Sequence, residues 1–242
     1  GILIIGNEIL SGRTLDTNGN WLCDKLTNLG VRVNEIRTVP DIEENIVQAL
    51  YHMEPLHDFI FTTGGIGPTH DDITAESVAK YFNIEVKLNT SAHKILIKKY
   101  GERLNEARLK MAFIPEGATL IKNNISAAPG FKIHNIYVFA GVPQIMKAMF
   151  NSIKADIKSN TNFYSVSLTG MFGEGDIATD LKNIQINNPY VDIGSYPKFE
   201  SNKVYCTITI RSIDMNKLDQ AHKEIQILFN KNNIDLIDVI KI

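Results

Sequence analysis

The hydrophobic residues of the first 160 or so positions fall either into short continuous runs or into helical spacing. Continuous runs such as Ile2–Ile5 and 58–62 are typical of strands covered on both faces. Stretches such as 18–29 and 74–82 instead place their apolar side chains on one side of a helix. Strands that alternate with helices predict right-handed crossovers and a mostly parallel sheet, so the expected fold class is α/β. The predicted strands are 2–5, 31–39, 58–62 and 136–140, and the predicted helices are 18–29, about 42–52, 74–82, most of 90–111 and about 143–157.

The pattern changes after a polar segment at 160–162, which we interpret as a linker. Beyond it the predicted order is strand, helix, strand, strand, helix, strand, which is the split, ferredoxin-like βαββαβ arrangement of a small α+β domain. We therefore expect two domains, at 1–158 and 162–242. The elements predicted for the second are strands at 163–169, 191–196, 203–211 and 236–240 and helices at 176–186 and 215–230.

A glycine-rich segment at 62–74 joins a predicted buried strand to a predicted helix. Its three glycines carry no Cβ, so a ligand can approach the backbone N–H groups closely. Those N–H groups and the positive end of the following helix favour an anion such as phosphate. Asp71 and Asp72 lie in the same segment, and Mg²⁺ prefers one or two carboxylates together with phosphate and water oxygens. The alternative is a structural turn whose aspartates cap the helix.

Three loops are expected to meet at one edge of the sheet. The loop 6–12 follows the first strand, and the glycine-rich segment follows a later one. Gly141 forms a turn between a third strand and a helix that begins at Pro143. In such sheets, ligands bind beyond the carboxyl ends of the strands. We therefore expect segments that are distant in the sequence to form one cleft. Asp41 and Glu44 have the spacing of a capping box at the start of another helix.

The region 90–111 is rich in Lys and Arg, and the solvated face of an amphipathic helix accounts for most such side chains. Arg108 and Lys110 stand out, because a diphosphate needs cations and the glycine-rich segment supplies none. His70 lies beside the aspartate pair and is a candidate catalytic group. Its alternative is a solvated loop histidine.

Bulk composition narrows the class of protein. The chain has 242 residues, of which 44% are hydrophobic and 21% charged, as in an ordinary globular protein. A net charge of −2 without a dense basic block argues against a nucleic-acid partner. Two cysteines are too few for a disulfide scaffold or a cysteine zinc site, so we expect a cytoplasmic protein. No apolar run approaches the roughly 20 residues that span a bilayer, so no membrane partner is expected.

Several separate motifs occur in a fixed order, at 6–12, 16–18, 63–74, 114–118, 128–131 and 141–143. Together they resemble the competence/damage-inducible protein A (CinA) family, whose amino-terminal part has the molybdopterin-binding MoaB/Mog fold. The resemblance covers about residues 1–157 and implies a MoaB/Mog-like three-layer sandwich. The remainder looks like the second domain of the same family. The match does not extend to the nicotinamide-mononucleotide deamidase domain of longer members, so the chain resembles the stand-alone branch.

The resemblance implies a divalent-metal-dependent hydrolase of nucleotide diphosphate linkages, with ADP-ribose as the usual substrate and FAD as the substrate of a relative. It implies that Asp71 and Asp72 hold the cation, Mg²⁺ or a similar ion, and that Glu8 faces the same pocket. The candidate catalytic residues are thus Glu8, Asp71 and Asp72. The candidate residues for binding substrate or phosphate, including the two cations noted above, are Gly6, Asn18, Gly64, Gly65, Gly67, Thr69, Arg108, Lys110, Ala128, Pro129, Gly130, Gly141 and Pro143.

The expected mechanism is attack of a metal-activated water on one phosphorus, with backbone N–H groups stabilising the transition state. Glu8 is a candidate general base or a ligand through water, and capping of its loop is the alternative. A second hypothesis is a protein that binds molybdopterin or a nucleotide, or an adenylyltransferase, because fold alone does not decide function. A third is a non-catalytic interaction module, against which the costly pairing of carboxylates argues. By analogy with this fold we also expect a homo-oligomer.

Overall fold

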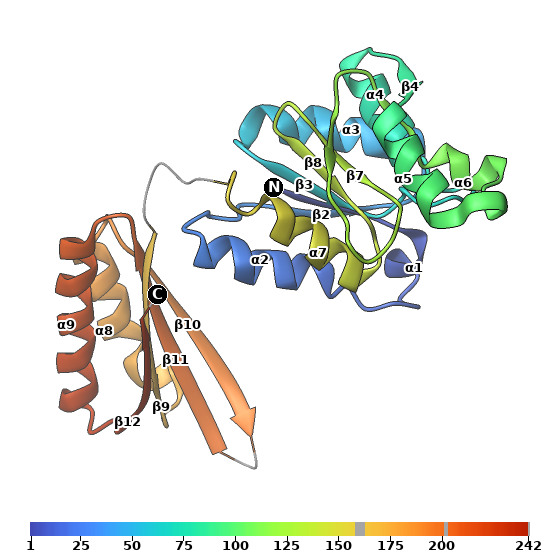
Figure 1. Cartoon of the computed structure of the whole chain (residues 1–242). Helices are drawn as coiled ribbons and strands as arrows, with labels where there is room; N and C mark the ends of the chain where they lie inside the picture. The colour runs from blue at the N-terminus through green and yellow to red at the C-terminus, as the bar shows by residue number, and fades with distance from the viewer. Residues whose placement is uncertain (158–162, 201–202, 242) are drawn as a thin grey trace. The chain divides into compact units, whose positions relative to one another are not determined.

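Two compact units divide the chain, one built mainly from residues 1–158 and the other mainly from residue 159 onward. The structure is a computed structural model that describes residues 1–157, 163–200 and 203–241 (Figure 1). The segment 160–162, interpreted above as a linker, lies outside the described residues. In the described part of the chain, no helix combines the length and the apolar character that crossing a bilayer requires.

A six-stranded sheet, in the order β2-β1-β3-β8-β7-β6, forms the centre of the first unit. The four strands from β2 to β8 pair in parallel, and β7 pairs antiparallel both with β8 and with the edge strand β6. The predicted, mostly parallel sheet is therefore confirmed. Its strands are β1 (Ile2–Ile5), β2 (Ile36–Val39), β3 (Ile60–Thr63), β6 (Thr119–Ile121), β7 (Gly130–Ile133) and β8 (Ile136–Phe139).

Helices cover both faces of this sheet and make three layers (Figure 1). On one face lie α2 (Asn18–Asn28) and α7 (Pro143–Ile153), where the Phe150 ring contacts the rings of Trp21, Phe61 and Phe139. On the other lie α3 (Glu43–Met53) and α4 (Thr74–Phe82), whose apolar side chains share one buried core with β1, β3 and β8. Burial of this apolar surface on both faces drives the layers together.

The remaining elements of the first unit are short. A turn of helix, α1 (Asn7–Leu10), lies inside the loop 6–12, and a 3₁₀ turn, η1 (Glu54–Leu56), follows α3. A separate two-stranded sheet pairs β4 (Val86–Leu88) with β5 (Phe113–Pro115). Between those strands lie α5 (Thr90–Tyr100), the 3₁₀ turn η2 (Gly101–Arg103) and α6 (Glu106–Lys110).

The first unit departs from the sequence prediction in four places. The strand predicted at 31–39 begins only at Ile36, and the helix predicted over most of 90–111 is broken by Gly101, whose φ of +52° ends α5. The helix predicted to reach residue 157 ends at Ile153. Strands of three or four residues, β4 to β7, were not predicted because so few residues show no clear periodicity.

The capping box predicted around Asp41 was wrong. Ile42 holds the capping position of α3 and makes no side-chain hydrogen bond there. The Asp41 Oδ2 atom instead accepts a hydrogen bond of 2.7 Å from the backbone N–H of Asn7. This carboxylate therefore joins the loop after β1 to the loop after β2.

The second unit is a four-stranded antiparallel sheet, in the order β10-β11-β9-β12, with two helices against one face (Figure 1). Leu168 and Ile208 of the central strands pack with Ile177 and Ile225 of the helices in one buried cluster. The predicted βαββαβ order is confirmed. Its elements are β9 (Tyr164–Gly170), α8 (Glu174–Asn187), β10 (Asp192–Glu200), β11 (Lys203–Ser212), α9 (Met215–Lys231) and β12 (Leu236–Lys241).

We predict that Gly64→Ala destabilises the first unit by about 3 kcal/mol, because the position combines a φ of +111° with a backbone collision. A Cβ there would lie 2.0 Å from the carbonyl oxygen of Ile5. Gly117→Ala is the matched control, since its φ is +83° but no atom lies within 4 Å of a Cβ. The control should lose only about 1 kcal/mol. Calorimetric unfolding of the two variants checks this, and equal losses would contradict it.

Candidate functional site

The three loops expected to converge do meet. A cavity of ≈ 440 Å³ lies beyond the carboxyl ends of β1, β3 and β8, and the loop that follows each of these strands lines it. Ten of the residues proposed from sequence are in its lining: Glu8, Gly64, Gly65, Gly67, Thr69, Asp71, Asp72, Arg108, Ala128 and Gly141.

The start of the glycine-rich loop is held by backbone geometry that requires glycine. Gly64 and Gly65 both have positive φ, and a Cβ on Gly65 would lie 2.2 Å from the Thr74 hydroxyl oxygen. That hydroxyl donates a 2.9 Å hydrogen bond to the Gly64 carbonyl, while the Thr74 N–H donates to the Gly65 carbonyl. The structural alternative is thus correct in part, because these glycines are needed for the turn whether or not a ligand binds.

Thr69 joins the aspartate pair. Its hydroxyl oxygen lies 2.5 Å from Asp71 Oδ1 and 2.5 Å from Asp72 Oδ2, and its backbone N–H donates to the same Asp72 oxygen at 2.8 Å. The hydroxyl bond holds the pKa of Asp71 below its ordinary value, so this exposed side chain is a carboxylate at neutral pH. One hydroxyl hydrogen cannot be shared fully by two carboxylates, and a cation between them would relieve the remaining repulsion.

The chemistry of this pair fits a magnesium-type ion. Within the described residues, no cluster of three or more His, Cys, Asp or Glu side chains is placed to hold a metal ion. Mg²⁺ does not need such a cluster, because it commonly takes one or two carboxylates and fills its remaining positions with phosphate and water oxygens. Asp71 and Asp72 would therefore hold a cation together with a ligand rather than alone.

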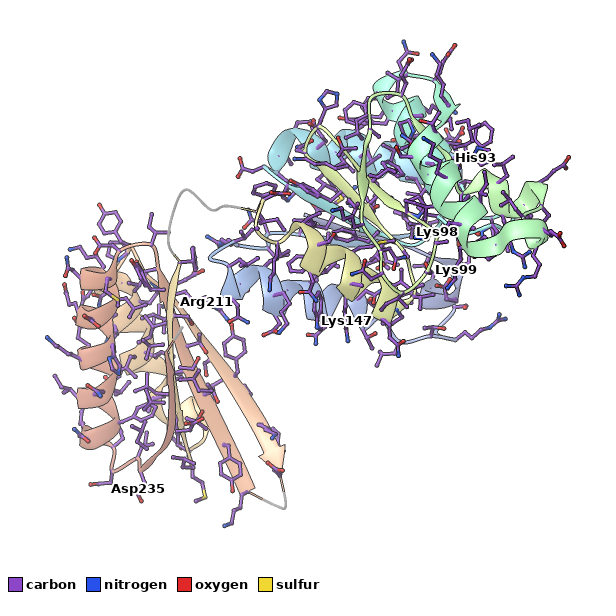
Figure 2. All side chains as sticks on the ribbon, viewed as in Figure 1. His93, Lys98, Lys99, Lys147, Arg211 and Asp235 are labelled. Atoms are coloured by element: carbon purple, nitrogen blue, oxygen red, sulfur yellow. The ribbon has the colours of Figure 1, made fainter. Side chains whose placement is uncertain are left out.

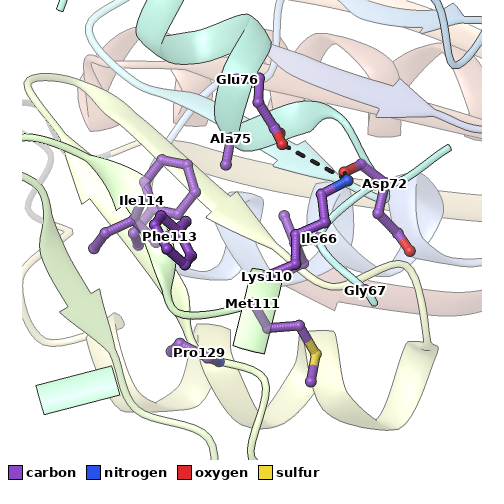
Figure 3. Close-up of a pocket in the computed structure, with 12 residues that line it drawn as sticks. Ile66, Gly67, Asp72, Ala75, Glu76, Lys110, Met111, Phe113, Ile114 and Pro129 are labelled. Atoms are coloured by element: carbon purple, nitrogen blue, oxygen red, sulfur yellow. Dashed lines mark hydrogen bonds and ion pairs between the residues drawn. The ribbon is translucent and has the colours of Figure 1, made fainter. Parts of the chain in front are cut away.

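The two cations proposed from sequence have structural partners. The Lys110 amine donates to the carbonyl oxygens of Asp72, at 2.6 Å, and of Thr69, at 3.2 Å, and it pairs with Glu76 at 3.6 Å (Figure 3). Lys110 thus ties α6 to the far end of the glycine-rich loop. The Arg108 guanidinium lines the cavity, donates to the Arg103 carbonyl and lies over the Tyr100 ring.

Asn18 lies in a second hollow of ≈ 80 Å³, which adjoins the main cavity and shares Glu8 and Gly141 with it. The Asn18 amide donates to the Thr63 hydroxyl oxygen at 2.8 Å and to the Gly141 carbonyl at 2.7 Å. Both amide hydrogens are therefore used, and none is left for a phosphate. The Asn18 Oδ1 atom is buried and has no hydrogen-bond partner among the described residues. Pro143 lines the same hollow.

The other proposed residues lie around the cavity rather than in its wall. Pro129 lines a pocket of only ≈ 20 Å³ on the α4 side of the loop (Figure 3). Gly130 is part of β7, where a Cβ would lie 2.5 Å from the Val138 carbonyl oxygen. A Cβ on Gly6 would meet the Glu8 carboxylate at 2.6 Å, so this glycine leaves space for the Glu8 side chain. His70 is exposed and is not part of the lining of these pockets.

We expected the start of α4 to face the cavity, but the start of α7 does so instead. Residues of the first turn of α4, which follows the glycine-rich loop, line the ≈ 20 Å³ pocket. Val142 and Ile145 at the start of α7 line the main cavity instead, and α7 has no side-chain cap. The positive end of α7 therefore favours an anion there.

Sequence reasoning also missed part of the wall. The lining includes Asp41, Tyr100, Met111, Ser126, Val142 and Ile145. Asp41 could have been found from its position directly after β2, whose carboxyl end meets the same edge of the sheet. Tyr100 is the last residue of α5 and lines the cavity because the helix ends there. The sequence signals this helix end only by a single glycine, Gly101.

An α/β sheet with a cleft at its carboxyl edge, a glycine-rich loop and a carboxylate pair is typical of a protein that binds a small molecule. Residues 1–158 match the family model described as a probable molybdopterin binding domain, and residues 162–237 match the middle domain of FAD synthase. The chain belongs to the family of probable molybdopterin-binding domains.

Known relatives agree with this assignment. A protein of Archaeoglobus fulgidus is 34% identical over 229 residues, covering 95% of this chain and 97% of that protein. A putative competence-damage inducible protein of Clostridioides difficile is 35% identical over 196 residues. The match covers 77% of this chain and 47% of the length of that protein. The crystal structure of CinA from Thermoplasma acidophilum, of unknown function, superposes with a TM-score of 0.61 at 34% identity, over 64% of this chain and 95% of that one. The resemblance to the CinA family and the MoaB/Mog-like fold are thereby confirmed.

We predict that Lys110→Met loosens the glycine-rich loop, because its amine is a donor to two loop carbonyls. Amide hydrogen exchange at residues 69–73 should accelerate, and the unfolding free energy should fall by about 1 kcal/mol. Lys98→Met is the control, because Lys98 is exposed on α5 (Figure 2). Equal exchange rates in the two variants would show that Lys110 does not hold the loop.

Proposed function

We propose that the chain binds a phosphorylated pterin or nucleotide, with the phosphates against the Gly64–Thr69 backbone and a divalent cation at Asp71 and Asp72. The observation that carries this proposal is the composition of the ≈ 440 Å³ cavity, where bare glycine backbone, the start of α7 and a carboxylate pair meet. The family match to molybdopterin-binding domains supports a small-molecule ligand of this kind.

Charge explains why the cation belongs to the proposal. Glu8, Asp41, Asp71 and Asp72 all line the cavity, whereas Arg108 is its one cationic side chain among the described lining residues. A phosphate entering alone would be repelled by the nearest carboxylates. A divalent cation between the aspartate pair and the phosphate oxygens removes this repulsion and uses the Mg²⁺ preference for mixed carboxylate and phosphate ligands.

We predict that Asp71→Asn combined with Asp72→Asn weakens ADP binding in the presence of Mg²⁺ by about 10-fold or more. The same variant should strengthen the binding measured in EDTA, because it removes the carboxylates that repel the phosphates. The asparagine oxygens can still accept the Thr69 hydrogen bonds, so the loop should keep its conformation. Titration calorimetry with and without Mg²⁺ measures both.

The matched control is Asp219→Asn combined with Asp235→Asn, which makes the same change in net charge at two exposed positions. Asp235 is labelled in Figure 2. This control variant should bind as the unchanged protein does. If the double variant at 71 and 72 keeps its Mg²⁺-dependent affinity, the cation is held elsewhere and the proposal is wrong.

A second candidate function is hydrolysis of a diphosphate linkage such as that of ADP-ribose. The observation that favours it is Glu8, an exposed carboxylate that lines the main cavity together with the aspartate pair. Placed there, Glu8 would take a proton from the water whose oxygen forms the new P–O bond, while the bridging P–O bond breaks. A bound divalent cation would supply neutralisation of the phosphate oxygens.

We predict for this second candidate that Mg²⁺ and purified protein convert ADP-ribose to AMP and ribose 5-phosphate. Glu8→Gln should lower that turnover about 100-fold or more with little change in ADP-ribose affinity. Chromatographic analysis of the products checks both statements. Tight binding of intact ADP-ribose or of molybdopterin, without cleavage, would support the binding function and contradict the hydrolytic one.

A further inference from the structure

One wall of the main cavity has a chemistry that phosphates and a cation do not use. Tyr100, at the end of α5, and Arg108, on α6, both line the cavity and are both half-buried. The Arg108 Cζ atom lies 4.8 Å from the centroid of the Tyr100 ring, which is the geometry of a cation–π pair. A flat guanidinium and a flat ring are therefore placed together in the wall of the ligand cleft.

The local sequence fixes this pair. Gly101 ends α5 and begins η2, and the Asn105 side chain caps α6 by accepting a 3.0 Å hydrogen bond from the backbone N–H of Arg108. The Arg108 guanidinium also donates to the Arg103 carbonyl. Because Arg108 is held at both its backbone and its side chain, it is positioned before any ligand arrives, which lowers the entropy lost on binding.

Apolar residues lie beside Tyr100. Tyr100 packs against a buried apolar cluster that contains Met111, as Ala128 does, and both Met111 and Ala128 line the same cavity. Apolar walls beside a flat aromatic surface suit a planar ring, since stacking needs a π-face and no particular donor or acceptor. They do not suit a sugar, whose hydroxyl groups would lose hydrogen bonds to water there.

We propose that Tyr100 and Arg108 form a stacking platform for the planar heteroaromatic ring of the ligand. This inference rests on the proposed function and assigns the residues that recognise the ring. Adenine, pterin and flavin rings share the required flat π-surface. Arg108 is accordingly a positioning group for the ring, and it also brings to the cavity the one positively charged side chain among the described lining residues.

The test separates ring recognition from phosphate recognition. Affinities for ADP and for inorganic diphosphate, which lacks a ring, are measured by titration calorimetry in Mg²⁺. The unchanged protein should bind ADP about 10-fold or more tightly than diphosphate. Tyr100→Leu should weaken ADP binding by a similar factor and change diphosphate binding less than about 2-fold. Tyr100→Phe, which keeps the ring, should restore ADP binding to within about 3-fold.

A matched control comes from the second unit. Tyr196 is also paired with an arginine, since the Cζ atom of Arg211, which is labelled in Figure 2, lies 5.9 Å from its ring centroid. Tyr196 is not among the residues that line this cavity. Tyr196→Leu should leave both affinities unchanged. FMN gives a second readout: its fluorescence should be quenched on binding to the unchanged protein and to Tyr100→Phe, and not quenched by Tyr100→Leu.

The outcomes distinguish the two proposals. If neither ADP nor diphosphate binds, the proposed function and the platform fail together. If both ligands bind with equal affinity, or if Tyr100→Leu weakens both alike, only the platform is overturned. Selective loss of ADP affinity with rescue by Tyr100→Phe supports it, and comparison of ADP, a phosphorylated pterin and FMN then shows which ring is preferred.

Discussion

The close approach of three strand ends is the constraint on which the cleft depends. A Cβ on residue 64 would lie only 2.0 Å from the carbonyl oxygen of Ile5, at the end of β1. Gly64 itself donates to the carbonyl of Phe139, at the end of β8, and a Cβ on Gly141 would come within 3.3 Å of the Gly64 Cα. Because residue 64 has no side chain, the loops after β1, β3 and β8 can meet around one point. A bulkier residue there would separate them and with them the candidate site.

The far end of the same loop is held by polar contacts rather than by close packing. Thr69 brings the two carboxylates together, and Lys110 fixes the loop carbonyls from α6. Both contacts lie at an exposed or half-exposed surface, where hydrogen bonds contribute little to overall stability. They do fix where the two carboxylates lie, and a cation site depends on that placement more than on stability. One end of the loop is thus specified by backbone sterics and the other by side-chain chemistry.

The sequence predicted the parts of the structure that follow from hydrophobic patterning and from the order of strands and helices. Buried runs such as Ile2–Ile5 gave the parallel strands, and the rule that ligands bind at the carboxyl ends of strands gave the convergence of Glu8, Gly64 and Gly141. What depends on tertiary contacts was not predicted. Asp41 was interpreted as a helix cap, although its carboxylate bonds to a loop 34 residues away. Asn18 was proposed to face the pocket and to bind substrate or phosphate, yet its amide hydrogens are already donated within the protein. Periodicity carries no signal for either contact, and none for the turn that brings Tyr100 to the cavity.

The balance of charge around the cavity favours a binding loop over a purely structural turn. A turn needs the glycines for its backbone and at most one aspartate for a cap, and here α4 is not capped by any side chain. Two carboxylates that meet at one hydroxyl oxygen, with Glu8 and Asp41 lining the same cavity, are electrostatically costly to a turn. The cost falls when a cation lies between them, and a cation that two carboxylates hold still seeks further oxygens. The glycine backbone leaves room for a phosphate to supply those oxygens. Loop, carboxylates, cation and anionic ligand are therefore complementary as a set. Without the cation the carboxylates repel the ligand, and without the ligand the cation lacks part of its coordination.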